Sequence, residues 1–151
     1  IAGSSAPAGV PVDGDLQHEK LLDDIQAYSF ALDKNGLPHI FYYSGHVFKY
    51  AKWTGMSWST QTIDSTDGFA PNAPSSIALD ENNYPHIAYC NETQFALKYA
   101  KWTGKTWETS VIGPAIGRGA VSLALDGKGD SHIVYYSGDG ELMWIHKGRN
   151  Q

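Results

Sequence analysis

A seven-residue stretch, KYAKWTG, occurs twice in the chain, at residues 49–55 and again at residues 98–104. Identity over that length indicates an internal repeat, and a repeat constrains the fold more strongly than any local pattern. A second stretch, ALD, occurs three times, and its aspartates Asp33, Asp80 and Asp126 are separated by 47 and 46 residues. The sequence therefore predicts three related units along one chain.

Each unit is predicted to contain four short β-strands. In the first unit we expect them near residues 27–33, 38–43, 47–53 and 58–63. The first of these strands alternates bulky with small residues, which fits an innermost strand held between neighbouring sheets. A period near 46 residues with several short strands per unit is typical of propeller blades and not of a helical solenoid.

The third unit ends before a fourth strand, so the three units account for eleven strands. Residues 1–26 form an N-terminal arm that contains the stretch LQHEKLLDDI. We expect this stretch to supply a blade-closing strand, with Leu22 placed like Ile63 and Ile112. The predicted blades then comprise residues 27–73, 74–119 and 120–151.

The fold class predicted from this pattern is all-β, a β-propeller with three four-stranded blades per chain. Three blades are fewer than the usual four to eight, and an open arc leaves two blade faces and a strand edge exposed. We therefore expect half of a six-bladed ring, closed by a two-fold homodimer that exchanges the N-terminal strand. The alternative is that these residues are a piece of a longer propeller.

The composition excludes several classes of partner. The net charge of −5 argues against nucleic acid, which binds basic surfaces. No apolar run approaches the roughly 20 residues of a membrane span. The single cysteine, Cys90, excludes an internal disulfide framework. Asn91-Glu92-Thr93 fits the N-glycosylation pattern, which matters only in a eukaryotic secretory setting.

The unit ALDxxGxPHIxYY…KYAKWxGxxW resembles the β-propeller repeats of secreted bacterial and archaeal proteins, a group allied to the sialidase-like propellers. The resemblance covers about Ala27 to Lys147. The sialidase Asp-box, Ser/Thr-x-Asp-x-Gly-x-Thr-Trp, does not occur, so sialidase catalysis is not expected. The short, aromatic-rich blades are also similar to those of small bacterial and fungal propeller lectins. This second resemblance implies a secreted module that binds sugars in pockets between blades.

The lectin resemblance makes four tryptophans and one arginine the candidate ligand-binding residues: Trp53, Trp58, Trp102, Trp107 and Arg118. Indole faces stack on the apolar side of a pyranose while nearby polar groups fix its orientation. The simpler interpretation of the tryptophans is cross-strand packing around a hairpin. Arg118, between two glycines in a segment outside the repeat, is the candidate for an anionic ligand.

Two further residue types recur in all three units. We interpret His39, His86 and His132 as structural positions that hydrogen-bond neighbouring strands, with a ring of imidazoles that binds a metal or an anion as the alternative. Asp33, Asp80 and Asp126 are interpreted as turn residues, because no acidic ligand follows at the twelfth position of a calcium loop. We expect neither a metal nor a cofactor.

Three functions remain open from the sequence. We favour a secreted, non-catalytic binding module for carbohydrate. The second is a polysaccharide lyase or glycoside hydrolase that uses a histidine and a tyrosine such as His39 and Tyr43. The third is a structural or assembly subunit in which the propeller is only a scaffold.

Overall fold

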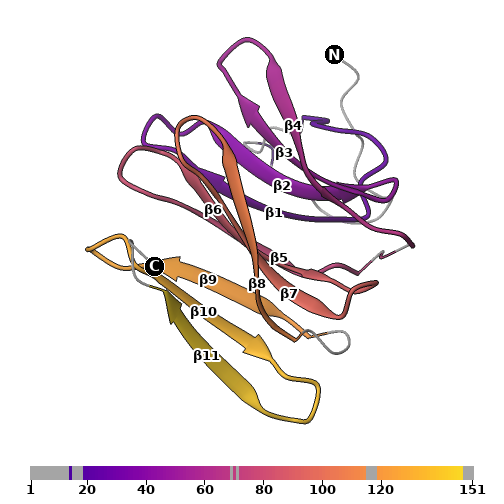
Figure 1. Cartoon of the computed structure of the whole chain (residues 1–151). Helices are drawn as coiled ribbons and strands as arrows, with labels where there is room; N and C mark the ends of the chain where they lie inside the picture. The colour runs from indigo at the N-terminus through magenta and orange to yellow at the C-terminus, as the bar shows by residue number, and fades with distance from the viewer. Residues whose placement is uncertain (1–13, 15–18, 69, 71, 115–118, 148–151) are drawn as a thin grey trace.

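Three antiparallel sheets make up the part of the chain that the computed structural model describes, namely residues 14, 19–68, 70, 72–114 and 119–147 (Figure 1). Blade 1 contains β1 (Ala27–Leu32), β2 (Pro38–Ser44), β3 (Val47–Trp53) and β4 (Trp58–Ser65). Blade 2 contains β5 (Ser75–Leu79), β6 (Pro85–Asn91), β7 (Ala96–Trp102) and β8 (Trp107–Pro114). Blade 3 contains β9 (Val121–Leu125), β10 (Ser131–Tyr136) and β11 (Leu142–Lys147). These residues include no helix, and the predicted all-β fold and its eleven strands are confirmed.

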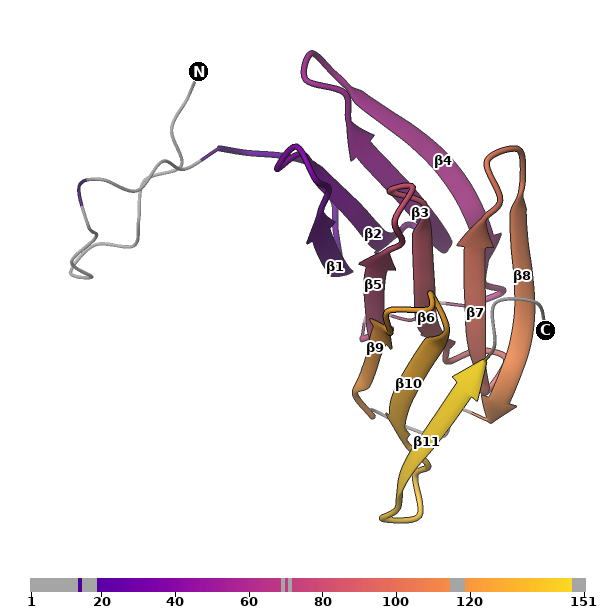
Figure 2. The same cartoon turned by 90° about the vertical axis from the view of Figure 1, so that its left-hand side faces the viewer.

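The blades are stacked face to face, and strands adjacent in the chain are adjacent in each sheet. The first strands β1, β5 and β9 lie next to one another, and β4 and β8 lie on the opposite side of the stack (Figure 2). Hydrogen bonds join the first strands across the blades: Ser75 Oγ donates to Ser29 Oγ at 2.9 Å, and the Leu123 N–H donates to Ser76 Oγ at 3.0 Å. The small face of each first strand therefore allows close approach at the inner side of the arc.

An aspartate closes the turn after the first strand of each blade. Asp33 Oδ1 accepts hydrogen bonds from the backbone N–H groups of Asn35 and Leu37, at 2.8 and 2.9 Å. Asp80 and Asp126 accept the equivalent pairs of bonds in blades 2 and 3. Side-chain acceptors of this kind stabilise turns, and this contact accounts for the repeated aspartate without a bound cation.

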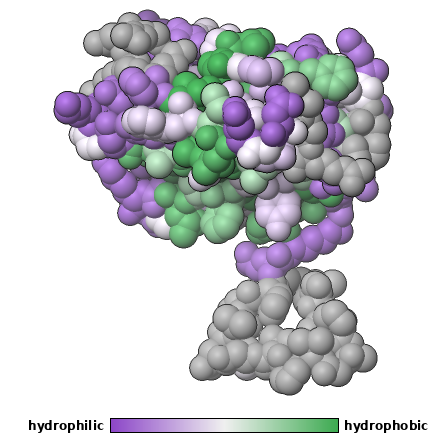
Figure 3. Space-filling view, turned by 90° about the horizontal axis from the view of Figure 1, so that it is seen from below, coloured by the Kyte–Doolittle hydropathy of each residue, from purple (hydrophilic) through white to green (hydrophobic). Residues whose placement is uncertain are grey.

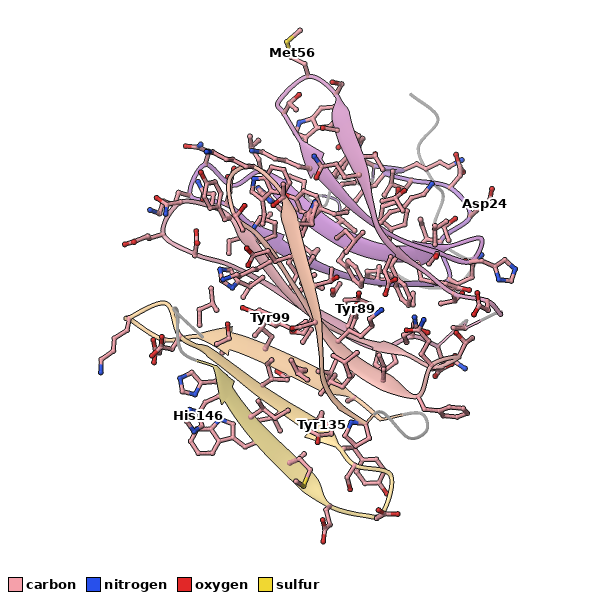
Figure 4. The ribbon with its side chains drawn as sticks, viewed as in Figure 1. Asp24, Met56, Tyr89, Tyr99, Tyr135 and His146 are labelled. Carbon is pink, nitrogen blue, oxygen red and sulfur yellow. The ribbon has the colours of Figure 1, made fainter. Side chains whose placement is uncertain are left out.

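Tyr89 on β6 fills the interface between blades 1 and 2 (Figure 4). Its ring packs against Phe41 and Phe48, with centroids 5.1 and 4.9 Å apart. The Tyr89 hydroxyl donates to Asp64 Oδ2 at 2.9 Å, and Lys98 Nζ donates to the same oxygen at 2.5 Å. Burial alone raises the pKa of Asp64, but these two donors and the Ser65 N–H together outweigh burial and lower it. An aromatic contact and a charged contact thus fix the same two blades.

The interface between blades 2 and 3 is a second hydrophobic cluster, in which Ala88, Cys90 and Leu97 stand where blade 1 has Phe41, Tyr43 and Phe48. Buried residues of blade 2 meet buried residues of blade 3, namely Ala88, Cys90, Leu97 and Tyr99 with Val121, Leu123, Ile133 and Tyr135. Burial raises the pKa of the Cys90 thiol to about 11, so the thiol is protonated at neutral pH.

Asn91 of the predicted glycosylation pattern is also buried, and its Nδ2 donates to Ser65 O of blade 1 at 3.4 Å.

The repeated histidine of blade 1 lies in the interior. His39 is fully buried, and a hydrogen bond of 2.6 Å joins its Nδ1 to the Tyr50 hydroxyl. Its Nε2 lies 3.6 Å from Asp33 Oδ2, beyond hydrogen-bond distance. Burial, reinforced by the charge of Lys52, lowers the pKa of His39. The imidazole is therefore neutral at physiological pH.

In blade 2 the same pair extends into the next blade. A hydrogen bond of 2.5 Å joins His86 Nδ1 to the Tyr99 hydroxyl, and another of 2.5 Å joins that hydroxyl to Ser131 Oγ on β10. His86 Nε2 lies 3.4 Å from Asp80 Oδ2. This chain of four polar groups crosses the interface between blades 2 and 3.

Blade 3 lacks the tyrosine of this chain. Trp144 stands at the position of Tyr50 and Tyr99, and its ring stacks on His132 with centroids 5.9 Å apart. His132 Nε2 is hydrogen-bonded to Asp126 Oδ2 at 3.0 Å. This contact, together with the hydrogen bonds from the Asp130 and Lys128 N–H groups, lowers the pKa of Asp126 to about 2.

The two end blades each expose a hydrophobic face. On β1, Tyr28, Phe30 and Leu32 are 72%, 62% and 57% exposed. On β11, Leu142 and Trp144 are 76% and 62% exposed. Seen from below, on the side of blade 3, hydrophobic residues gather across the middle of the surface (Figure 3). The bulky face of β1, which the alternation predicts to lie between blades, is therefore uncovered in a single chain.

The described part of the N-terminal arm, residues 19–26, lies against blade 1 and is not in a strand. Leu22 and Ile25 pack on the outer face of this blade, against Ile40, Tyr42, Ala51 and Trp58. Residues 19–25 of the predicted segment thus have a place in the fold, but these residues form no strand. Its exchange with a second copy stays a prediction.

No helix among the described residues is long and apolar enough to cross a membrane.

We predict that neutral, buried His39 makes stability depend on pH. Its folded-state pKa lies below the unfolded value of about 6.5, so the unfolded chain binds a proton that the folded chain does not. The free energy of unfolding should therefore fall as the pH drops below about 6.5. Urea unfolding across this range should show a weaker pH dependence for His39→Gln than for the unchanged chain. The control is His132→Gln, at the half-exposed equivalent, and parallel pH profiles for His39→Gln and the unchanged chain would contradict the prediction.

His86→Ala should lower stability more than it lowers ligand binding. The substitution leaves the Tyr99 hydroxyl without its histidine partner beside Ser131, and losing a buried hydrogen-bond partner costs about 1–3 kcal/mol. Chemical denaturation measures the loss, and ligand titration of the folded variant measures binding. An unchanged melting temperature together with loss of a bound ligand or metal would reverse the structural interpretation.

Candidate pocket between blades 1 and 2

A pocket of about 180 Å³ lies where the outer strands of blade 1 meet the first turn of blade 2. Blade 1 supplies Tyr50, Lys52, Ser59 and Gln61, and blade 2 supplies Asn82, Asn83, Tyr84, Pro85 and Trp102. The pocket depends on blade stacking, because neither blade alone provides more than one side of it.

Blade 2 supplies the aromatic wall of the pocket, with Tyr84 and Trp102. Trp102 ends β7, and its cross-strand partner Trp107 begins β8, with ring centroids 5.6 Å apart. Tyr84 reaches the adjacent hairpin, where a Cβ added to Gly104 would lie 2.8 Å from the Tyr84 hydroxyl oxygen. Gly104 also has a φ of +93°, which favours glycine, so this position is suited to glycine on both counts. The hairpin and Tyr84 therefore fit closely against one another.

The blade 1 side of the pocket is polar. Lys52 on β3 and Gln61 on β4 line it, and Asn82 faces them from the turn of blade 2. The Trp107 indole N–H donates to Gln61 Oε1 at 2.6 Å, and the Trp107 ring meets Tyr50 edge-on at 5.1 Å. These contacts orient the Gln61 amide. Cationic and amide groups opposite an aromatic wall can bind hydroxyl groups around an apolar ring.

The structure separates the two predicted tryptophan pairs. Trp102 lines the pocket between blades 1 and 2, whereas Trp107 supports that pocket through Gln61. Trp53 and Trp58, with ring centroids 5.5 Å apart, line a different and larger cleft of about 710 Å³ beside the N-terminal arm. Both pairs are directly opposed across their hairpins, so cross-strand packing and ligand contact are compatible at these positions.

The other candidate residues do not join this pocket. Arg118 lies outside the described residues. The three histidines are divided among three blades, and within the described ranges no group of three or more metal-ligating side chains occurs. Their assignment as structural positions stays a prediction.

Sequence reasoning missed the polar side of the pocket. Lys52, Gln61 and Asn82 are separated along the chain by ordinary strand and turn residues, and they meet only because one blade stacks on the next. The repeat itself could have predicted this polar side. When like blades stack, the third strand of one blade lies near the first turn of the next blade.

No protein-family model and no curated protein sequence matches the chain. A fucose lectin from Kordia zhangzhouensis, whose structure was solved in complex with methyl-fucoside, has a similar fold, with a TM-score of 0.56. The match covers 82% of this chain and 93% of that chain at 19% sequence identity. At this identity, the similarity shows a common propeller fold.

Proposed function

We propose that the chain is a non-catalytic, lectin-like module that binds carbohydrate. The observation that carries the proposal is the pocket between blades 1 and 2, in which Trp102 and Tyr84 face Lys52, Gln61 and Asn82. The fold shared with a fucose lectin supports it. Because its repeats resemble those of secreted propellers, we also propose that the module acts outside the cell.

The pocket suits a single sugar ring. Its volume of about 180 Å³ is below the roughly 300–1,000 Å³ of sites for drug-sized ligands. The indole of Trp102 can stack on the apolar face of a pyranose. The Lys52 ammonium can donate to hydroxyl oxygens, and the Gln61 and Asn82 amides can both donate and accept. A terminal monosaccharide fits these features better than a long polysaccharide chain.

The enzymatic alternative has less support. His39 is fully buried and Tyr43 is 1% exposed, and both lie in the packed interior at the interface of blades 1 and 2. A general acid or base must come within hydrogen-bond distance of the proton that it transfers. Packing of the two blades keeps substrate from this pair.

The proposed partner is a second copy of the chain, in a six-bladed ring with exchanged N-terminal segments. In a head-to-tail pair, the exposed face of β11 would meet the exposed face of β1 of the other copy. The exchanged segment would pair with the free edge of β11, which has no fourth strand beside it in the described chain. Covering both exposed hydrophobic faces favours this closed arrangement over an isolated arc.

We expect Trp102→Ala to weaken binding at this pocket by about tenfold or more, which corresponds to about 1.4 kcal/mol. The substitution removes the stacking surface and leaves the blade interfaces intact. A glycan array identifies the ligands, and titration with methyl-fucoside, the ligand bound to the similar lectin, gives a first affinity. The exposed change Lys105→Ala is the matched control in the neighbouring hairpin. A folded chain that binds no glycan on the array would favour the scaffold function instead.

Light scattering should give a mass of about twice 16.5 kDa for the intact chain. Deletion of residues 1–25 should yield monomers or aggregates, because the edge of β11 and the face covered by Leu22 and Ile25 both become exposed. A well-behaved monomer of 16.5 kDa at micromolar concentration would contradict the ring.

A further inference from the structure

The large cleft beside the N-terminal arm repeats half of the pocket between blades 1 and 2. It is lined on the blade 1 side by Gly36, Leu37, Pro38 and Trp53. An offset of 47 residues places the first three on Asn83, Tyr84 and Pro85, and the KYAKWTG repeat places Trp53 on Trp102. All four equivalents line the pocket between blades 1 and 2. The cleft is therefore the same site, one blade earlier in the stack.

The N-terminal arm stands where a preceding blade would place its fourth strand. Leu22 packs on the outer face of blade 1, as Ile63 of β4 packs on blade 2. These two residues are 41 apart, and the same offset places Lys20 on Gln61. Lys20 lines the cleft just as Gln61 lines the pocket. The arm thus provides a second wall of the site in the matching register.

A third wall is missing. In the pocket between blades 1 and 2, β3 supplies this wall with Tyr50 and Lys52. No described residue ahead of blade 1 forms a third strand at this place, and the cleft is correspondingly larger, about 710 Å³ against about 180 Å³.

Strand β11 carries the residues that fit the missing wall. Strand pairing places Trp144 at the position of Tyr50, and His146 at the position of Lys52. Both side chains are exposed, and His146 projects from the margin of blade 3 (Figure 4). Within a chain, Tyr50 meets Trp107 edge-on, and Trp58 is the blade 1 equivalent of Trp107. The exposed ring of Trp144 thus has a counterpart at the cleft.

We propose that the cleft at Trp53 is a second glycan site, shared between two copies of the chain and completed by Trp144 and His146 of the second copy. This inference rests on the proposed function. The contact between copies would repeat the blade stacking that occurs twice within the chain. Blade 3 of one copy would pack on blade 1 of the other copy as blade 1 packs on blade 2.

The shared site differs chemically from the pocket within the chain. Leu37 replaces Tyr84, His146 replaces Lys52 and Lys20 replaces Gln61, so one wall of the site is more apolar and its cation lies on the arm. The extended apolar face of a 6-deoxyhexose suits the wall formed by Leu37 and Trp53. Methyl-fucoside, a deoxyhexoside, is therefore the appropriate probe.

The test uses the full chain with Trp102→Ala, which weakens binding at the pocket between blades 1 and 2 by about tenfold or more. Methyl-fucoside binding, measured by titration calorimetry, should persist in this variant. Adding Trp53→Ala should abolish it, and adding His146→Ala should weaken it by about tenfold or more while the mass remains that of a dimer. Lys105→Ala in the same background is the control and should leave binding unchanged.

Mixed dimers test whether two chains share the site. Chains with Trp53→Ala and chains with His146→Ala, both in the Trp102→Ala background, are refolded together with different affinity tags. The purified mixed dimer contains one junction with both faces intact and one with both faces altered. It should regain one site with the affinity of the Trp102→Ala dimer, whereas a dimer carrying both changes in each chain should not.

Each outcome decides between the proposals. Binding that is lost with Trp102→Ala alone overturns the second site and leaves the proposed function standing. Binding that depends on Trp53 but not on His146, or that a mixed dimer does not regain, overturns the sharing between chains. If the unchanged chain binds no sugar, both the proposed function and the shared site are overturned.

Discussion

The stacking of one blade on the next is the interaction on which the rest of this structure depends. Each blade is a single sheet with two hydrophobic faces, and a sheet of this kind must bury at least one of them. The ring of Tyr89 meets Phe41 and Phe48 while its hydroxyl reaches Asp64 on the outermost strand of blade 1. One side chain therefore fixes both the depth and the lateral position of the blades, and the pocket at their rim follows from this alignment.

The repeated interface also explains why the ends of the chain differ from its middle. A stack of like units always ends in two unlike faces, here the bulky face of β1 and the face of β11 that carries Trp144. The N-terminal arm covers part of the first face with Leu22 and Ile25. Nothing in the described chain covers the face of β11 that carries Trp144. The arm and β11 together provide what one further blade would provide, and this relation underlies both proposals for a second copy.

The sequence allowed the strands and turns to be predicted closely, because alternation within strands and the aspartate turns are local properties. Ser131 is a different case. It replaces the proline of the other blades and bonds Tyr99 across an interface, a contact between residues 32 positions apart. The pocket was only half predictable for the same reason: Trp102 belongs to a visible repeat, whereas Lys52 and Asn82 acquire a role only when two blades meet. The packing of Leu22 and Ile25 on blade 1 was hard to predict, because the segment that carries them has no clear alternation of apolar and polar residues.

Blade 3 carries an indole where the other blades carry a phenol, and this exchange has a mechanical consequence. The interface between blades 2 and 3 contains a series of hydrogen bonds that runs from His86 through Tyr99 to Ser131. Trp144 has no hydroxyl group, so an interface made by the Trp144 face of β11 cannot contain the same series of hydrogen bonds. The interface between blades 1 and 2 also lacks these bonds, because Pro85 stands at the position of Ser131, but there Tyr89 and Lys98 both contact Asp64. In a ring built from two copies, the interface between copies would be without the hydrogen bonds that link His86, Tyr99 and Ser131. On dilution, such a ring would dissociate at the interfaces between copies, while the three blades of each chain stayed folded and stacked.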